Sequence, residues 1–185
     1  VGDMIFNEQI SRLPGAEHRQ LLRIMQEADI AYGNLEFSIN DRPELQRPFY
    51  NFRAPTEFAW EVAAIGINLV SLSNNHAFDF GPEGLTECLR SLDRVNIGHA
   101  GAGMSLAAAH APAVMRVQGR RTSFALLNYM RYWTMKYRSR DSAGPSLSTI
   151  DPATILIARG DGESEAVEGL LESDVQTMED DIVLV

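Results

Sequence analysis

The sequence predicts an α/β fold in which amphipathic helices alternate with short apolar strands. Three helices are expected, at residues 17–28, 55–65 and 82–95. Each is followed by an apolar run that reads as a strand, at residues 29–35, 68–73 and 97–103. A pair of strands then follows at 113–118 and 122–128, joined at Gly119 and Arg120. This order favours a mixed α/β layer structure over an all-parallel sheet.

Each helix has a pattern of its own. In the first, Leu21, Leu22, Ile24 and Met25 recur at helical spacing after Pro14 and Gly15. In the second, Thr56 is the expected N-cap and Gly66 the expected C-cap. In the third, Leu85, Leu89 and Leu92 lie on one face, and Pro82 stands near the start.

The rest of the chain is less regular. We expect a surface loop at 40–52, a short helix at 104–110 and an irregular basic segment at 131–150. An acidic helix is expected at 164–178, with a strand from residue 182 onward.

Length and composition limit the function classes. A chain of 185 residues suits one domain, and we expect it to be part of a longer protein, cut at both ends. The net charge of -9 argues against general nucleic-acid binding, which depends on neutralising phosphates. Cys88 is the only cysteine, so no disulfide forms within the chain. No apolar run approaches the ~18 residues of a membrane helix.

Polar side chains stand where three predicted strands end. The first place is Gly2-Asp3, the second is Gly33-Asn34-Leu35-Glu36, and the third is the stretch from Ser73 to Gly81. The third reads Ser-Asn-Asn-His-Ala-Phe-Asp-Phe-Gly and follows an apolar strand directly. Strand ends of this kind are where α/β proteins build metal or phosphate sites.

The residue types at these strand ends suit a divalent metal. Asp3 and Glu36 would supply negative charge, and Asn75 a neutral oxygen. His76 would either ligate the ion or protonate a leaving group. Asp79 stands three residues later and would orient the imidazole of His76. With no cysteine in reach, the expected ion is manganese, magnesium, iron or zinc.

The same residues can also have purely structural roles. Gly2-Asp3 and Gly33-Asn34 are natural turns, and Glu36 can be a solvated side chain. Asn74, Asn75 and His76 can cap the loop before the third helix.

For other polar groups the structural reading is preferred. No carboxylate lies at ligand spacing from His99 or His110, and Gly101-Ala102-Gly103 is better explained as a tight turn than as an anion cradle. The basic run from Arg131 to Arg140 is better explained as a solvated loop than as a grip for an anionic substrate.

Several of these residues, taken in order, resemble a known family. The elements are Gly2-Asp3, Asn34-Leu35-Glu36, the run from Phe52 to Pro55, Ser73-Asn74-Asn75-His76 with Asp79-Phe80-Gly81, and the stretch from Gly98 to Gly103. Together they resemble the bacterial capsule-synthesis CapA family, the poly-γ-glutamate synthesis group within the calcineurin-like metallophosphoesterase superfamily. The resemblance covers roughly residues 2–128.

This resemblance implies a four-layer α/β sandwich, of which the chain would be an incomplete N-terminal portion. It implies a two-metal site in which Asp3 is a ligand, Glu36 stands at the bridging carboxylate and Asn75 binds the second ion. His76 would be the acid near the leaving group, held by Asp79, with Asn34 and Asn74 as supporting residues. Ile5 stands where the wider superfamily has a histidine, and we expect the remaining histidine motifs to follow residue 185 in the parent protein.

The function implied is a metal-dependent hydrolase or transferase of poly-γ-glutamate capsule biosynthesis. Its substrate would be an anionic polymer, or a phosphoester or amide. The alternatives are a non-catalytic binding component of a polymer synthesis or export complex, with a membrane-bound synthase as partner, and a plain interaction domain. The resemblance also implies a cell-surface or membrane-associated location.

Overall fold

The computed structural model describes residues 2–6, 8–43, 51–117, 119, 123–131, 144–147 and 149–150. Its helices are η1 (Ile10–Arg12), α1 (Ala16–Glu27), α2 (Phe58–Ala64), α3 (Gly81–Arg94) and α4 (Leu106–His110). Its strands are β1 (Asp3–Met4), β2 (Tyr32–Leu35), β3 (Ser38–Ile39), β4 (Arg53–Ala54), β5 (Leu69–Ser71), β6 (Gly98–Ala100), β7 (Ala102–Gly103), β8 (Ala113–Arg116), β9 (Ser123–Leu126), β10 (Met130–Arg131), β11 (Ser146–Leu147) and β12 (Thr149–Ile150).

The centre of the fold is a four-stranded sheet in the order β1-β2-β5-β6, and all its neighbouring strands are parallel. The carboxyl ends of these strands therefore lie along one edge. β8 and β9 form the expected antiparallel hairpin. The mixture of parallel and antiparallel pairs confirms the α/β class, while the four-layer metallophosphoesterase sandwich stays a prediction.

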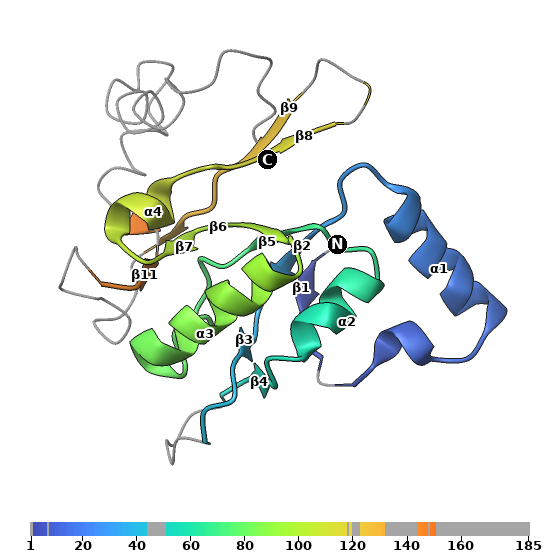
Figure 1. The fold of residues 1–185 in the computed structure, drawn as a ribbon, viewed down its shortest axis with the longest axis horizontal. Helices are drawn as coiled ribbons and strands as arrows, with labels where there is room; N and C mark the ends of the chain where they lie inside the picture. Colours follow the sequence, from blue (N-terminus) through green and yellow to red (C-terminus); the bar gives the residue numbers. More distant parts are fainter. Residues whose placement is uncertain are drawn as a thin grey trace.

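Two apolar clusters pack against the central sheet. The larger contains Val70 of β5 together with residues of α2 and α3, which lie in front of the sheet in Figure 1. The smaller joins Leu69 of β5 and Ala100 of β6 to Leu126 of the hairpin. Because neighbouring residues of a strand point to opposite faces, Leu69 and Val70 place the two clusters on opposite sides of the sheet.

Helix α3 follows its sequence pattern closely. Leu85, Leu89 and Leu92 are all buried, and Pro82 lies in the first turn, where its missing N–H costs no hydrogen bond. Cys88 is buried on the same face. The apolar spacing therefore predicted both the helix and the side that faces the core.

The ends of α2 differ from the prediction. The helix begins at Phe58, and Thr56 instead donates its backbone N–H and its hydroxyl to the carboxylate of Asp41. The expected N-cap was therefore wrong: Glu57 precedes the helix, and its side chain accepts no hydrogen bond from the N–H groups of the first turn. Ile65 is the C-cap, and Gly66 follows it with φ 97°, the left-handed position typical of the residue after a helix.

Short strands were the other source of error. The strand expected at 97–103 is divided into β6 and β7 at Gly101, which has φ 91°. The loop expected at 40–52 is flanked by two strands that were not expected, β3 and β4, which pair in parallel. Strands β11 and β12 fall in the segment expected to be irregular. Strands of two residues are too short to show a period of two.

Some predictions lie outside the described residues. These are the helix at 164–178, the strand from residue 182 and all but the first residue of the basic run. Among the helices that are described, none combines the length and apolar character needed to cross a membrane.

Candidate functional site

A row of polar residues crosses the central sheet near its carboxyl edge. Asp3 of β1 pairs with Asn34 of β2, which pairs with Ser71 of β5. Paired residues of parallel strands point to the same face, so the three side chains lie side by side. The Asn34 amide donates from Nδ2 to Asp3 Oδ1 at 2.8 Å. We refer to these residues, together with Glu36, Asn74, His76 and Asp79, as the strand-end cluster.

The orientation of the Asn34 amide is fixed by its other hydrogen bonds. Its Oδ1 accepts from Ser71 Oγ at 3.1 Å and from Asn74 Nδ2 at 3.0 Å. The Ser71 hydroxyl is in turn 2.9 Å from the hydroxyl of Tyr32. Because the donors all meet Oδ1, Nδ2 must face Asp3, and this holds the Asp3 carboxylate in place.

Glu36 follows Asn34 by two residues, so it points to the same face as Asn34 just beyond the end of β2. Burial raises the pKa of the Glu36 carboxyl, and the hydrogen bond and negative charge of Asp3 raise it further. Positive charge on His76 acts in the opposite direction. Asp3, Glu36 and His76 are therefore close enough to interact electrostatically.

The turn after β5 is tied to β2 by Asn74. This buried side chain donates from Nδ2 to the Leu35 carbonyl oxygen at 2.8 Å, and its Oδ1 accepts from the backbone N–H groups of His76 and Ala77. Asn74 thus performs the turn-forming role that was weighed as the structural alternative. By doing so it sets the position of His76 relative to Glu36.

His76 is held from two sides. Its Nδ1 lies 2.8 Å from Asp79 Oδ2, and Asp79 is buried. The ring of Phe52 packs edge-on against the imidazole, with centroids 4.6 Å apart, and its backbone N–H donates to the same Asp79 oxygen at 3.3 Å. The side chain of His76 keeps 16% of its surface exposed, so a bound molecule can reach it.

The cluster satisfies only part of what a metal ion needs. Asn75 is exposed on the turn, and no hydrogen bond links it to the rest of the described chain. Across the described residues, no group of three or more His, Cys, Asp or Glu side chains is arranged to hold a metal. Adjacent carboxyl groups nevertheless form the hard, negative donor pair that divalent ions prefer. The donor chemistry fits such an ion, and further ligands would have to join Asp3 and Glu36.

His99 and Gly101 lie outside the strand-end cluster, and both were considered in the sequence analysis. His99 has a carboxylate partner that the sequence spacing did not reveal, because the fold brings its Nε2 to 3.1 Å from Asp93 Oδ1 on α3. Gly101 is a close-packed turn, as preferred from the sequence: a Cβ there would lie 2.2 Å from Asn128 Oδ1 and 2.7 Å from Ser73.

Sequence reasoning missed three contributors to this edge of the sheet. Tyr32 and Ser71 support Asn34, and Asn128 accepts from the Ser73 N–H at 2.6 Å. Asn128 could have been predicted from the sequence, because it follows an apolar strand as the other strand-end residues do. Tyr32 and Ser71 lie inside strands, where only the register reveals them.

We compared the chain with known protein families and with proteins of similar sequence. The whole chain, residues 1–185, matches the family described as bacterial capsule synthesis protein PGA_cap. Two proteins of Sinorhizobium fredii (strain NBRC 101917 / NGR234), the uncharacterized proteins y4sH and y4uA, are each 31% identical over 151 residues. Those matches cover 78% of this chain and 32% of each relative, so the chain spans about a third of their length. The family expected from the strand-end motifs is confirmed, and the chain belongs to the bacterial capsule synthesis protein PGA_cap family.

Proposed function

We propose that this chain contributes the strand-end part of a metal-dependent hydrolase or transferase that works in the synthesis of poly-γ-glutamate or a related capsule polymer. The bond attacked would be a phosphoester, amide or peptide-like bond in an anionic substrate. The observation that carries this proposal is the chain of hydrogen bonds that links Asp3, through Asn34 and Asn74, to the turn on which His76 is held by Asp79. Clustered acids beside a positioned histidine are typical of catalytic rather than structural sites.

Asp3 and Glu36 are the residues that would hold the metal. The ion would be manganese, iron, zinc or magnesium, with two ions in the complete site and Asn75 offering a neutral oxygen from the rim. A divalent ion bound there would supply Lewis-acid activation of a water and of the substrate oxygens. Asn34 keeps the Asp3 carboxylate directed into the site through the 2.8 Å hydrogen bond described above.

His76 is proposed as the general acid. With Nδ1 donating to Asp79 Oδ2, the Nε2 nitrogen is the one left to face a substrate. The contact with Asp79 holds the orientation of the ring. In the charged state Nε2–H would donate its proton to the departing oxygen or nitrogen, and the neutral ring would then be recharged from solvent.

A second candidate is a binding component of a polymer synthesis or export complex without catalysis. The observation that favours it is the lack, among described residues, of a ready three-ligand metal group. In that case a membrane-bound polymer synthase would be the partner. Both candidates suit a protein of the cell surface or membrane, where a capsule polymer is assembled.

The experiment uses the full-length parent protein, with its metal content measured and its turnover tested on a phosphodiester and on a γ-glutamyl amide. His76→Asn should lower turnover by roughly 10²–10⁴-fold for substrates with poor leaving groups, and much less for a nitrophenyl ester. Its metal content should stay unchanged. His18→Asn, on α1 outside the cluster, is the matched control.

Equal turnover of wild type and His76→Asn on the poor leaving group would contradict the role of general acid. Turnover that survives complete metal removal would contradict the metal-dependent reaction. If the protein shows no turnover but retains a polymer synthase in the presence of chelator, the binding candidate replaces the catalytic one.

A further inference from the structure

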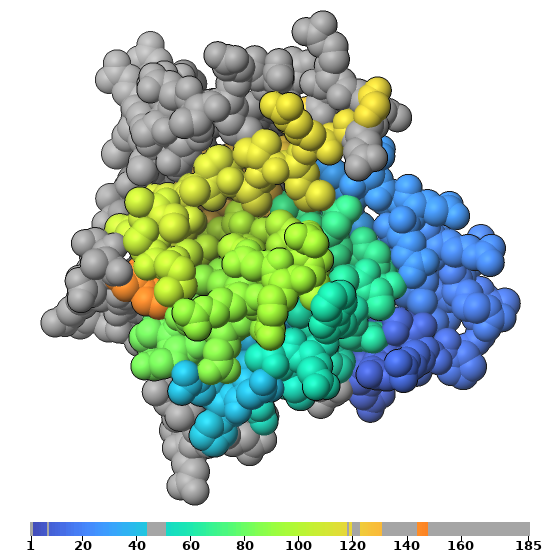
Figure 2. Space-filling model, viewed as in Figure 1, coloured from blue at the N-terminus to red at the C-terminus, as the bar shows by residue number. Residues whose placement is uncertain are grey.

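A second polar cluster lies on the solvent side of α3, made of other residues than the strand-end cluster. It forms an open pocket of about 560 Å³, lined by Asp41, Thr56, Glu87, Arg90, Asp93 and Arg94. Its residues come from α3, from the segment after β3 and from the turn before α2, which lie side by side on the face drawn in Figure 2. We refer to it as the α3 pocket. Its volume is within the range of small-ligand sites.

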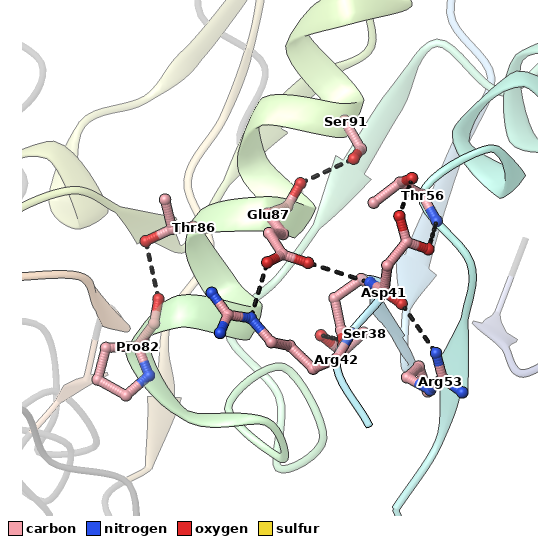
Figure 3. Close-up of polar contacts among 10 residues, drawn as sticks. Ser38, Asp41, Arg42, Arg53, Thr56, Pro82, Thr86, Glu87 and Ser91 are labelled. Carbon is pink, nitrogen blue, oxygen red and sulfur yellow. Dashed lines mark hydrogen bonds and ion pairs between the residues drawn. The ribbon is translucent and has the colours of Figure 1, made fainter. Parts of the chain in front are cut away.

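The carboxylates of the α3 pocket already have hydrogen-bond donors. Asp41 accepts from the N–H and the hydroxyl of Thr56, as Figure 3 shows. Glu87 accepts from Arg42 Nε at 2.7 Å with one oxygen and from the Asp41 N–H at 3.0 Å with the other. Asp93 pairs with His99. Each of the three carboxylates therefore has at least one partner within the protein.

The two arginines of the α3 pocket, in contrast, have few hydrogen-bond partners within the protein. Arg90 is exposed and makes no hydrogen bond or ion pair in the part of the chain that the structure describes. Arg94 donates one hydrogen bond, to Ser91 Oγ at 2.9 Å. Each guanidinium carries five N–H donors, so most of the donors in the pocket have no protein partner. Because the two residues are four apart on α3, their side chains lie on the same face of the helix.

Hydrogen bonds of Asp41 connect the three segments that form the α3 pocket. Asp41 joins the turn before α2 through Thr56 and joins α3 through Glu87. The Thr56 hydrogen bonds hold the pKa of the Asp41 carboxyl below its ordinary value, and the charges of Arg53 and Arg94 lower it further. Asp41 thus stays ionised and keeps its bonds to Thr56 and α3 at neutral pH.

We propose that the α3 pocket binds an oxyanion, the carboxylate or phosphate group of an anionic ligand, through Arg90 and Arg94. The planar guanidinium fork matches the geometry of both groups and binds either one with two parallel hydrogen bonds. Charge alone does not carry this inference, because three carboxylates line the pocket and only two arginines do. What carries it is the surplus of unpaired donors over unpaired acceptors. The proposal does not depend on the metal site.

The test measures binding of inorganic phosphate and of glutarate to the full-length protein by calorimetry, with chelator present so that no metal ion contributes. Saturable binding of either probe is expected. Arg90→Gln should weaken it by about tenfold, because it removes a charged donor from the bound oxyanion. Arg94→Gln should act in the same direction, and the probe that binds more tightly identifies the ligand class.

Arg23→Gln on α1 is the matched control, because it removes one exposed arginine charge outside the pocket. It should leave both affinities unchanged. Arg90→Lys, which keeps the charge but loses the fork, should weaken binding as Arg90→Gln does. Failure of both probes to saturate would overturn the proposal, and so would an equal loss of affinity in Arg23→Gln, which would show attraction by net charge alone.

Discussion

The strand-end cluster and the α3 pocket both contain carboxylates and hydroxyls, and they differ in which charged groups remain to meet a ligand. At the strand ends the amides and the serine hydroxyl are used up in fixing one another, and the carboxyls of Asp3 and Glu36 remain to face each other. In the α3 pocket the carboxylates are supplied with donors, and the guanidinium of Arg90 remains. The first arrangement favours a cation and the second an anion.

This contrast follows from the elements that carry each cluster. The strand-end residues lie on a parallel sheet whose register sets their spacing, so a support such as Asn34 can be placed behind a carboxylate. The α3 pocket lies on an exposed helix face, where four-residue spacing brings two arginines together. Carboxylates are present in both clusters, so their presence alone does not identify the kind of ligand. The hydrogen-bond partners of the charged groups indicate whether it is a cation or an anion.

The largest effect is expected at Gly101, where the sheet edge is most crowded. Gly101→Ala places a Cβ 2.7 Å from Ser73 Cβ and 2.2 Å from Asn128 Oδ1, at a φ of 91°. We expect a loss of roughly 3 kcal/mol or more in the free energy of unfolding, from strain and overpacking together. Urea unfolding of the full-length protein measures it.

Gly119→Ala is the control for backbone strain alone. Gly119 has φ 75°, and beyond its chain neighbours nothing in the described part of the chain lies within 4 Å of the place that a Cβ would take. The substitution should cost only about 1–2 kcal/mol. Equal losses in the two variants would show that the edge near Asn128 is not tightly packed.

A smaller but more informative effect is expected at Asn34. Asn34→Ala removes the acceptor shared by Ser71 and Asn74 and the donor to Asp3, which should cost roughly 2–4 kcal/mol of stability. Asn75→Ala removes the same kind of side chain from an exposed position and should stay within about 0.5 kcal/mol of wild type. If the two variants were equally stable, the hydrogen-bond relay behind Asp3 would not be holding the site.

How much of this was predictable differs between the same two regions. The apolar spacing of Leu85, Leu89 and Leu92 predicted α3 and its buried face. The strand-end pattern predicted that polar groups would lie together there, as Asp3, Asn34 and Asn74 do. Neither could reveal that Asn34 works through its amide oxygen, because that depends on strand register. The α3 pocket was missed altogether, since Asp41 and Glu87 are far apart in sequence and meet only through tertiary packing.

The α3 pocket predicts a modest, pH-dependent effect. Asp41→Asn should cost about 1 kcal/mol at neutral pH, because an amide accepts less strongly from Thr56. The pKa of Asp41 is lowered in the folded state from its ordinary value of 3.8, so its contribution is present above that pH and is lost as the pH falls through the folded value. The stability gap between wild type and variant should close in strong acid. A gap that stays constant with pH would mean that the charge of Asp41 is irrelevant.

The smallest effect concerns the buried side of α3, opposite the pocket. Burial raises the pKa of the Cys88 thiol to about 11, so it stays neutral at pH 8. Because this pKa is above the ordinary value of 9.0, any linked stability is intact below pH 9 and is lost as the pH rises toward 11. Iodoacetamide should label Cys88 in urea but scarcely in the native protein. Rapid native labelling would show that the helix face is not packed as described.

The most direct test of the account is a manganese titration of the full-length protein followed by electron paramagnetic resonance. Wild type should bind Mn²⁺ with a signal distinct from the free ion, and Glu36→Gln should weaken this binding by at least about tenfold. Glu17→Gln, an exposed acid on α1, should bind as wild type does. Binding that is equally strong in wild type and Glu36→Gln would contradict the claim that the ends of the central strands form a cation site.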